Sequence, residues 1–474
     1  MKINFPRFFC RADFWLPLIF FLAFAAYGVA AGPHPFVRDS THYWELRRTF
    51  FDHSGHFSLL NYVDADFQLR GYVFPLILLC VEWLLDIFTP DRWMTDSLTA
   101  ILFNAATFLL LAWVLLPALF SRLTGQTVSL RFRALLTGLL FVFWRGFLFY
   151  PLSDFPALVF CLAGWLALLL LFQPFSSPPV KILLAFLAGS ALMAAYLTRP
   201  VYLLTLGVAA LALLFARAKN FSFLQRFSSL LAFLLAAALL LWPQYRINQI
   251  HYGLNSPWIS DKLYAYHIAN GFLVQRFEVN QDLSSYPLPN ARYYDLQAQT
   301  VLQRTGLAEL SLANLPQLFL RYPLDVTSVY FRHFFNGLSP FYDSLYVTNI
   351  LRPDWFLLWL SYSIFFAVFY FFDWRRLFAL QPALSVFTLG GWLLPVLTAV
   401  PAVTEARFYL PLNAFLLMIF SALCLTPADW RAKFAAEGWF RPVFFYLLFL
   451  LLCFALAGQI LISVSDIPIL LTPQ

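Results

Sequence analysis

The sequence predicts an all-α polytopic membrane protein. Hydrophobic residues make up 61% of the 474 residues and charged residues only 12%, and the mean hydropathy is +0.72. A soluble protein of this length could not bury so much apolar surface, because even large domains keep polar faces toward water. Apolar runs near the length of a membrane-crossing helix recur along the chain and indicate the same fold class.

About eleven of these runs are long enough to cross a bilayer, within a range of ten to thirteen. They lie at about 14–32, 96–119, 134–151, 155–172, 182–198, 201–216, 228–243, 355–372, 379–400, 407–426 and 443–463. The first run follows Lys2, Arg7 and Arg11 and could be a signal peptide. No small-residue cleavage site precedes the polar sequence, so we interpret it as a retained helix.

A further run, Val73–Phe88, is shorter and carries Glu82 and Asp86. If it does not cross, the loops on the N-terminal side hold twelve basic residues and only three acidic ones, Asp373, Asp429 and Glu437. The twelve are Arg122, Arg131, Arg133, Lys181, Arg217, Lys219, Arg226, Arg375, Arg376, Arg431, Lys433 and Arg441. Because basic residues favour the cytoplasmic side, we predict that 73–89 is a juxtamembrane or re-entrant helix, with the N-terminus inside and the C-terminus outside.

This topology divides the chain into three segments. Residues 1–243 form an N-terminal transmembrane catalytic module that includes a first outer loop, 33–95. Residues 244–354 form a second large outer loop, with surface helices expected around 312–338, and 355–474 are C-terminal transmembrane helices. Both large loops and all seven histidines fall on the outer side, so we expect the protein to act there.

Several function classes are disfavoured. The net charge of +7 follows the membrane topology and does not indicate a nucleic-acid partner. The five cysteines lie in or beside apolar segments, which predicts no disulfide framework. No phosphate-binding loop or dinucleotide fingerprint is present, so neither ATP nor a dinucleotide is expected. Nothing resembles the nucleophile elbow of a serine hydrolase.

Ionisable residues at the outer ends of the predicted helices indicate a site. Asp39 follows the first helix, Asp154 lies in the turn YPLSDFPA, and Arg199 lies in the turn YLTRPVY. Glu405 and Arg407, in TEARFYLPL, cap the tenth helix. Charged groups at membrane depth are costly and mark candidate functional sites. Segments far apart in sequence therefore deliver carboxylates and arginines to one depth of one leaflet.

Each of these residues also has a purely structural interpretation. Asp154 could cap the fourth helix, since Ser153 and Pro156 complete a helix-start signal. Arg199 and Arg407 could extend to lipid headgroups. Asp64 and Asp66 could belong to an ordinary solvated turn. Three histidines of the first loop could suggest zinc, but their spacing matches no metal-binding motif: His42, His53 and His56.

The motifs together resemble the GT-C superfamily of integral-membrane glycosyltransferases, in particular the bacterial relatives of protein O-mannosyltransferases and of the lipid A aminoarabinose transferase. RDSTHYWELRRTF resembles the family's acidic residue before a juxtamembrane helix, and LRGYVFPLILL its basic residue before a second one. PLSDFPALVF, YLTRPVYLL and EARFYLPLNAFLL resemble its later outer turns. In that family the segment equivalent to 73–89 is also juxtamembrane.

The resemblance implies transfer of one sugar, with inversion, from a polyprenyl-phosphate donor at the periplasmic face of a bacterial inner membrane. Asp39 would be the general base. Arg70, Arg199 and Arg407, or a divalent cation, would stabilise the departing phosphate. Asp154 would orient a substrate or hold a metal, with Asp39 as the other metal ligand.

The resemblance also leaves several points open. The family often has two adjacent acids where this chain has Asp39 and Ser40, which puts metal dependence in doubt. The acceptor could be a lipid, a glycan or a protein, and Glu405 is a further candidate for substrate binding. Three aromatic residues of the first loop are candidates for stacking on a sugar: Tyr43, Trp44 and Tyr72.

Two other function classes compete with this interpretation. A flippase or transporter of lipid-linked sugars would place its ionisable residues near the bilayer midplane and would show repeated helices, and we find neither pattern. A polysaccharide polymerase or ligase would place its arginines in the second outer loop, where the candidates are Arg276, Arg292 and Arg304. A structural or assembly role is the remaining alternative.

Overall fold

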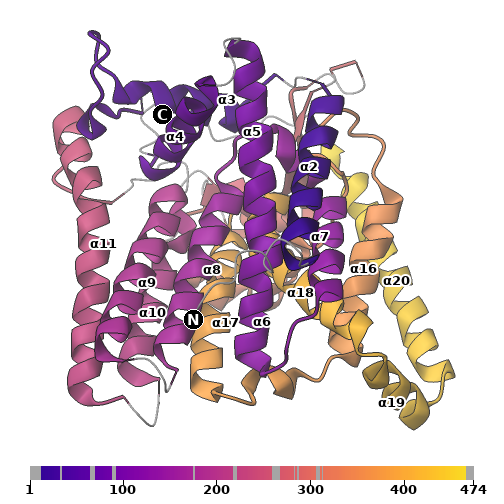
Figure 1. Cartoon of the computed structure of the whole chain (residues 1–474). Coiled ribbons are helices and arrows are strands. Elements are labelled where there is room, and N and C mark those ends of the chain that lie inside the picture. Colours follow the sequence, from indigo (N-terminus) through magenta and orange to yellow (C-terminus); the bar gives the residue numbers. More distant parts are fainter. Residues whose placement is uncertain are drawn as a thin grey trace. The chain divides into compact units, whose positions relative to one another are not determined.

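The computed structural model is mostly helical (Figure 1). It describes residues 12–32, 35–64, 70–87, 92–173, 177–216, 221–258, 267–268, 270–281, 283–284, 288–305, 310–311 and 313–465. Two compact units make up the chain. Unit 1 comprises residues 1–260 and 374–394, and unit 2 comprises residues 261–373 and 395–474. The division into three segments that the sequence suggested stays a prediction.

The predicted membrane spans are present as helices. Within the described ranges, eight are long and apolar enough to cross a membrane: Asp96–Thr124, Leu130–Phe149, Asp154–Leu171, Pro178–Thr198, Phe223–Tyr252, Pro382–Ala399, Ala406–Leu425 and Phe440–Leu461. Three apolar helices are shorter: Trp15–Ala30, Pro200–Phe215 and Trp355–Phe371. Each of the eleven runs found in the sequence corresponds to one of these helices. The prediction of a polytopic helical membrane protein is confirmed.

Unit 1 is built from helices throughout its described residues. The α-helices are α2 (Ala12–Ala30), α3 (Asp39–Leu46), α4 (Val73–Asp86), α5 (Arg92–Leu109), α6 (Leu116–Thr124), α7 (Leu130–Trp144), α8 (Asp154–Leu171), α9 (Pro178–Thr198), α10 (Leu203–Phe215) and α11 (Phe223–Tyr252). The short 3₁₀ turns are η1 (Arg47–Phe50), η2 (Leu59–Asn61), η4 (Arg145–Phe149), η5 (Pro200–Tyr202) and η6 (Trp374–Phe378). A π-helical turn, η3 (Leu110–Leu115), joins α5 to α6, and α17 (Pro382–Ala399) begins in this unit.

Helix α9 packs between α8 and α11. A Cβ atom at Gly189 of α9 would collide with the backbone of Phe233 in α11, so glycine permits this close approach. Helix α11 starts with a capping box in which Ser222 and Gln225 satisfy each other's backbone N–H groups, and it ends at Gly253 in the left-handed conformation (φ 65°). Sequence-local signals therefore set both ends of the longest helix.

Helix α4 does not carry the chain across the unit. Helices α2 and α5 run antiparallel, because Phe24 packs on Phe108 (ring centroids 6.3 Å apart) while the earlier Phe20 packs on the later Trp113 (6.0 Å). A crossing by α4 would have made them parallel. The structure therefore agrees with the assignment for α4, whose 14 described residues do not cross the unit between α2 and α5. A position of this helix along a membrane stays a prediction.

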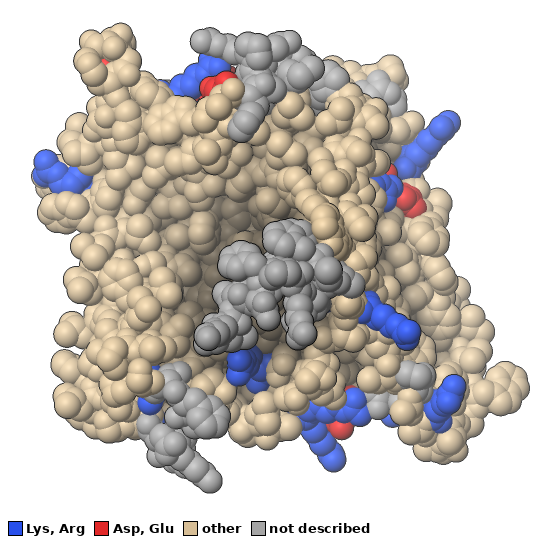
Figure 2. Space-filling model, in the orientation of Figure 1, with Lys and Arg blue, Asp and Glu red and all other residues tan. Residues whose placement is uncertain are grey.

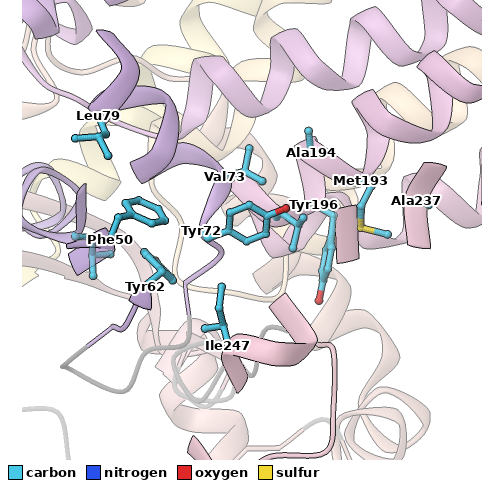
Figure 3. Close-up of a cluster of buried hydrophobic side chains, with 12 residues drawn as sticks. Phe50, Tyr62, Tyr72, Val73, Leu79, Met193, Ala194, Tyr196, Ala237 and Ile247 are labelled. Carbon is cyan, nitrogen blue, oxygen red and sulfur yellow. The ribbon is translucent and has the colours of Figure 1, made fainter. Parts of the chain in front are cut away.

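The first loop is anchored by a buried apolar cluster (Figure 3). Phe50, Tyr62 and Tyr72 from the loop pack with Tyr196 of α9 and Ile247 of α11, and each side chain is 3% exposed or less. Burying each such side chain contributes roughly 1.5–3 kcal/mol relative to leaving it exposed. The loop is thus held firmly at the end of unit 1 where α9 and α11 end.

The outward face of α11 has the composition expected of a lipid contact. Figure 2 shows no charged side chain over most of the length of α9, α10 and α11. Leu231, Leu235 and Leu239 on α11 are each about half exposed, and Trp242 follows at 60%. Tryptophan favours the membrane–water interface.

Unit 2 contains helices and a small sheet. The helices are α13 (Leu296–Thr305), α14 (Leu315–Arg321), α15 (Pro323–Gly337), α16 (Trp355–Phe371), α18 (Leu410–Leu425), α19 (Pro427–Glu437) and α20 (Phe440–Leu461), with a 3₁₀ turn η7 (Ala406–Tyr409). The strands are β1 (Val274–Asn280), β2 (Asn290–Tyr294), β3 (Tyr346–Val347) and β4 (Val464–Ser465), in the order β3-β1-β2-β4.

The helices expected around 312–338 are present as α14 and α15, but the sheet was not predicted. Strands β1 and β2 pair antiparallel, with Phe277 opposite Arg292. Strand β1 reads VQRFEVN, and its polar residues Gln275, Arg276 and Glu278 are all buried. A strand that buries polar side chains lacks the apolar–polar alternation by which strands are recognised in a sequence.

Candidate functional site

The first predicted site residue, Asp39, pairs with Arg70. Asp39 is the first residue of α3 and Arg70 lies just before α4, and a guanidinium nitrogen (Nη2) is 3.0 Å from Asp39 Oδ1. The Asp39 side chain is 33% exposed and that of Arg70 14% exposed. The pair is therefore accessible to a ligand, and its two side chains are already in contact with each other.

Tyr43 connects this pair to the start of α8. The Arg70 guanidinium lies over the Tyr43 ring, 4.5 Å from its centroid, and Phe74 packs edge-on against the same ring. The hydroxyl of Ser153 donates a hydrogen bond to the Tyr43 hydroxyl (3.0 Å). Because Ser153 precedes Asp154, a continuous set of contacts runs from Asp39 to the second predicted acid.

That second acid, Asp154, forms an ion pair with Arg199. Asp154 is the first residue of α8 and is 2% exposed, whereas Arg199 follows the last residue of α9 and its side chain is 17% exposed. The capping position of α8 is held by Ser153, and no side chain caps the helix there. Capping by Asp154 and headgroup contact by Arg199 are thus not the roles that the structure shows.

A buried carboxylate, that of Asp64, lies close to the Asp39–Arg70 pair. From the sequence alone, Asp64 and Asp66 could have belonged to a solvated turn. Asp64 is 1% exposed, so that interpretation is wrong for Asp64, while Asp66 lies outside the described residues. The Asp64 Oδ1 atom is 3.1 Å from Nε2 of His42, and Asp64 Oδ2 accepts a hydrogen bond from the backbone N–H of Arg70 (3.2 Å).

Burial acts to raise the pKa of Asp64, but the hydrogen bond and charge of His42, with the N–H and charge of Arg70, outweigh it. The pKa of Asp64 therefore lies below its ordinary value. The signal in the sequence was the spacing of His42 from Asp39, three residues along one helix, which places both on the same face.

Glu405 and Arg407 form an ion pair in unit 2. The Arg407 Nε atom is 2.7 Å from Glu405 Oε2, and each side chain is 12% exposed, so Arg407 does not simply reach toward headgroups. The backbone N–H of Phe277 in β1 donates to the carbonyl of Thr404 (3.0 Å), which places this turn beside the sheet.

The other two predicted aromatic residues pack inside unit 1. Trp44 is 6% exposed, and the guanidinium of Arg47 lies 3.6 Å from its ring centroid. Tyr72 is 3% exposed, and its hydroxyl donates to the carbonyl of Leu240 (2.9 Å). Sugar stacking by Tyr43, Trp44 and Tyr72 stays a prediction, and the structure shows that each ring already has a packing partner.

The described residues do not fit a metal ion at Asp39 and Asp154. Each carboxylate faces an arginine, and the described part of the chain holds no group of three or more His, Cys, Asp or Glu side chains arranged to bind a metal. Two carboxylates already paired with guanidinium groups are a poor ligand set for a hard cation. We therefore derive no catalytic step through a metal.

Comparison with known proteins gives a likeness in structure alone. No protein-family profile matches the chain, and no curated protein is detectably similar in sequence. Two solved structures from Archaeoglobus fulgidus are similar. Both are oligosaccharyltransferases. One is AglB with an inhibitory peptide and a dolichol-phosphate (12% identity, TM-score 0.41), and the other is tethered to an acceptor peptide containing the NVT sequon (11% identity, TM-score 0.44).

Each comparison covers 95% of this chain and 55% of the oligosaccharyltransferase. The chain thus spans about half the length of the two proteins. At these values the functional conclusion rests on the residues of the site.

Proposed function

We propose that the protein is a GT-C-type membrane glycosyltransferase. It moves one sugar from a polyprenyl-phosphate donor to a lipid, glycan or protein acceptor at the periplasmic face of a bacterial inner membrane. The observation that carries the proposal is the connected set of two aspartate–arginine pairs, Asp39–Arg70 and Asp154–Arg199, joined through Tyr43 and supplied by four separate segments of unit 1.

The reaction needs a base for the acceptor. Asp39 is the more exposed of the two predicted aspartates, so an acceptor hydroxyl can reach its carboxylate. As the hydroxyl oxygen bonds to the anomeric carbon, its proton passes to Asp39, and the bond from that carbon to the phosphate oxygen breaks. Attack from the face opposite the leaving phosphate inverts the configuration.

The reaction also needs positive charge for the leaving group. The electron pair of the broken bond stays on the polyprenyl phosphate, whose growing charge a planar guanidinium can bind through two parallel hydrogen bonds. Arg70 and Arg199 supply such groups in unit 1, and Arg407 is the third predicted phosphate ligand. A lipid-linked donor keeps its phosphate at headgroup depth, and it arrives already activated where no ATP is present.

Asp154 in unit 1 and Glu405 in unit 2 are the remaining predicted residues. Asp154 holds Arg199 in place and orients the sugar or the acceptor, because its buried carboxylate can point in only a few directions. Glu405 is the predicted substrate contact beside Arg407.

The proposal is tested by the variant Asp39→Asn, with Glu45→Gln as a control at an exposed position on the same helix. Mass spectrometry of envelope glycans and lipids should show one sugar lost in Asp39→Asn and retained in Glu45→Gln, at equal protein abundance. A normal product from Asp39→Asn would rule out the base assignment. Unchanged glycans in cells lacking the gene, with an accumulated solute, would favour a transporter instead.

A further inference from the structure

We infer that Asp64 is a positioning residue that sets the separation of Asp39 and Arg70. The inference rests on the proposed function, which assigns Arg70 to the donor phosphate. Asp64 touches neither the acceptor nor the donor in this scheme, because its side chain is fully buried. It acts through the two groups that it holds.

The carboxylate of Asp64 contacts both segments that carry the Asp39–Arg70 pair. Its Oδ2 accepts from the backbone N–H of Arg70 at 3.2 Å. Its Oδ1 lies 3.1 Å from Nε2 of His42, which stands one helical turn after Asp39 on the same face of α3. One buried side chain therefore ties the segment that carries the base to the segment that carries the phosphate ligand.

Asp64 is itself fixed from behind by the end of α11. The hydroxyl of Tyr252 accepts from the backbone N–H of Asp64 (2.7 Å) and donates to its carbonyl (3.1 Å). The ring of His251 lies 2.8 Å from the carbonyl of Leu60, in the same stretch of the first loop. The position of Asp64 is thus fixed by α11, a helix long and apolar enough to span a membrane.

Both backbone polar groups of Arg70 are hydrogen-bonded. Its N–H donates to Asp64, and its carbonyl accepts from the hydroxyl of Tyr62 (3.0 Å). Its side chain pairs with Asp39 and lies over the Tyr43 ring, so the position of the backbone sets where the guanidinium can reach. Displacement of a catalytic group by about 1 Å can lower the rate by a factor of about a hundred. Loss of the Asp64 contacts should therefore have a measurable effect on ligand binding and transfer.

The test is a double-variant cycle read out by ligand affinity. Native mass spectrometry of the full chain in detergent would measure binding of undecaprenyl phosphate to wild type, Asp64→Asn, Arg70→Ala and the double variant. We expect about tenfold weaker binding for Arg70→Ala, several-fold weaker binding for Asp64→Asn, and no further loss in the double variant. A residue that serves stability alone would lower the folded fraction, but the affinity of the folded molecules would not change.

Losses that multiply in the double variant, or an Asp64→Asn protein with wild-type affinity, would overturn the inference while leaving the proposed function in place. A wild-type protein that binds no undecaprenyl phosphate would overturn both. If Asp64→Asn does not accumulate, His42→Phe replaces it in the cycle, because it keeps an aromatic ring and removes the contact to Oδ1. Its effect should likewise vanish in the Arg70→Ala background, and an undiminished effect there would overturn the inference.

Discussion

The two units use the same residue types in opposite ways. In unit 2 the guanidinium of Arg276 is 1% exposed and donates to Glu278 (2.7 Å) and to the carbonyls of Asn336 (2.9 Å) and Ser339 (2.7 Å). In unit 1 the Arg70 guanidinium meets the partly exposed Asp39. Acceptors supplied by the backbone fix Arg276 within the fold, whereas Arg70 is placed where a substrate could compete for it.

This contrast bears on the polymerase alternative, which expected reactive arginines in the second outer loop. Of the candidates there, Arg276 is buried and hydrogen-bonded to Glu278 of the same strand and to the backbone near the end of α15. Burial and the nature of the acceptor, more than the presence of an ion pair, distinguish Arg276 from Arg70.

The largest effect should come from Arg276→Ala. It leaves Glu278 buried without its partner, which costs about 3–5 kcal/mol. We expect strongly reduced abundance and a lowered unfolding temperature, measured by intrinsic fluorescence in detergent. Arg70→Ala is the matched variant, and it should keep near-normal stability while losing transfer. Equal destabilisation by the two variants would remove the distinction between the units.

Arg199→Ala should fall between these extremes. Asp154 is 2% exposed, so losing its partner destabilises unit 1 by about 3 kcal/mol. The double variant Asp154→Asn/Arg199→Gln removes both charges and should recover abundance without recovering transfer. Recovery of both would make this pair structural, like Arg276–Glu278.

The pH dependence of stability should have opposite signs in the two units. The pKa of Asp64 is lowered in the folded state, so its stabilisation is complete above the ordinary value of about 3.9 and is lost at lower pH. Burial raises the pKa of Glu278 despite the opposing charge of Arg276, so its contribution to stability falls as pH rises through that raised pKa.

Unfolding temperatures measured from pH 4.5 to 7.5 would show this contrast. The difference between wild type and Asp64→Asn should stay constant over that range. The stability of wild type relative to Glu278→Gln should decline as pH rises. A wild-type advantage over Asp64→Asn that shrinks as pH rises over the same range would contradict the assigned direction, because only a raised pKa of Asp64 would produce it.

The smallest effect should come from Tyr43→Phe. It keeps the ring under Arg70 and removes only the hydroxyl that accepts from Ser153, a loss of about 1 kcal/mol. Transfer should fall less than tenfold, and Ser153→Ala should give a similar loss. If the two losses add fully when combined, the contact between Tyr43 and Ser153 does not join the two pairs.

Much of the architecture could be predicted because its causes are local or additive. Apolar run length gave the spans, and the balance of basic residues gave the non-crossing α4, which the antiparallel α2 and α5 confirm. The same count places Asp154 and Arg199 at helix ends, where the structure has them, and their location on the outer side stays a prediction. Their mutual pairing is tertiary, since 45 positions separate residues 154 and 199, and no periodicity encodes it.

The sheet and the buried role of Asp64 escaped prediction for a related reason. The polar pattern of Asp64 and its neighbours is typical of a solvated turn, and only Tyr252 from a distant helix makes it an interior position. Likewise the pattern of Arg276 and Glu278 is typical of an exposed strand, because the backbone carbonyls that accept from Arg276 lie about 60 residues further along the chain.

The order of the strands has a consequence for biosynthesis. Strand β4 pairs with β2, yet roughly 170 residues and four apolar helices separate them in the chain. At a synthesis rate of about 5–20 residues per second, β2 waits roughly ten to thirty seconds for that partner. Its open edge is a template for wrong pairing during the interval. A chaperone that covers this edge would act at this moment of the protein's assembly.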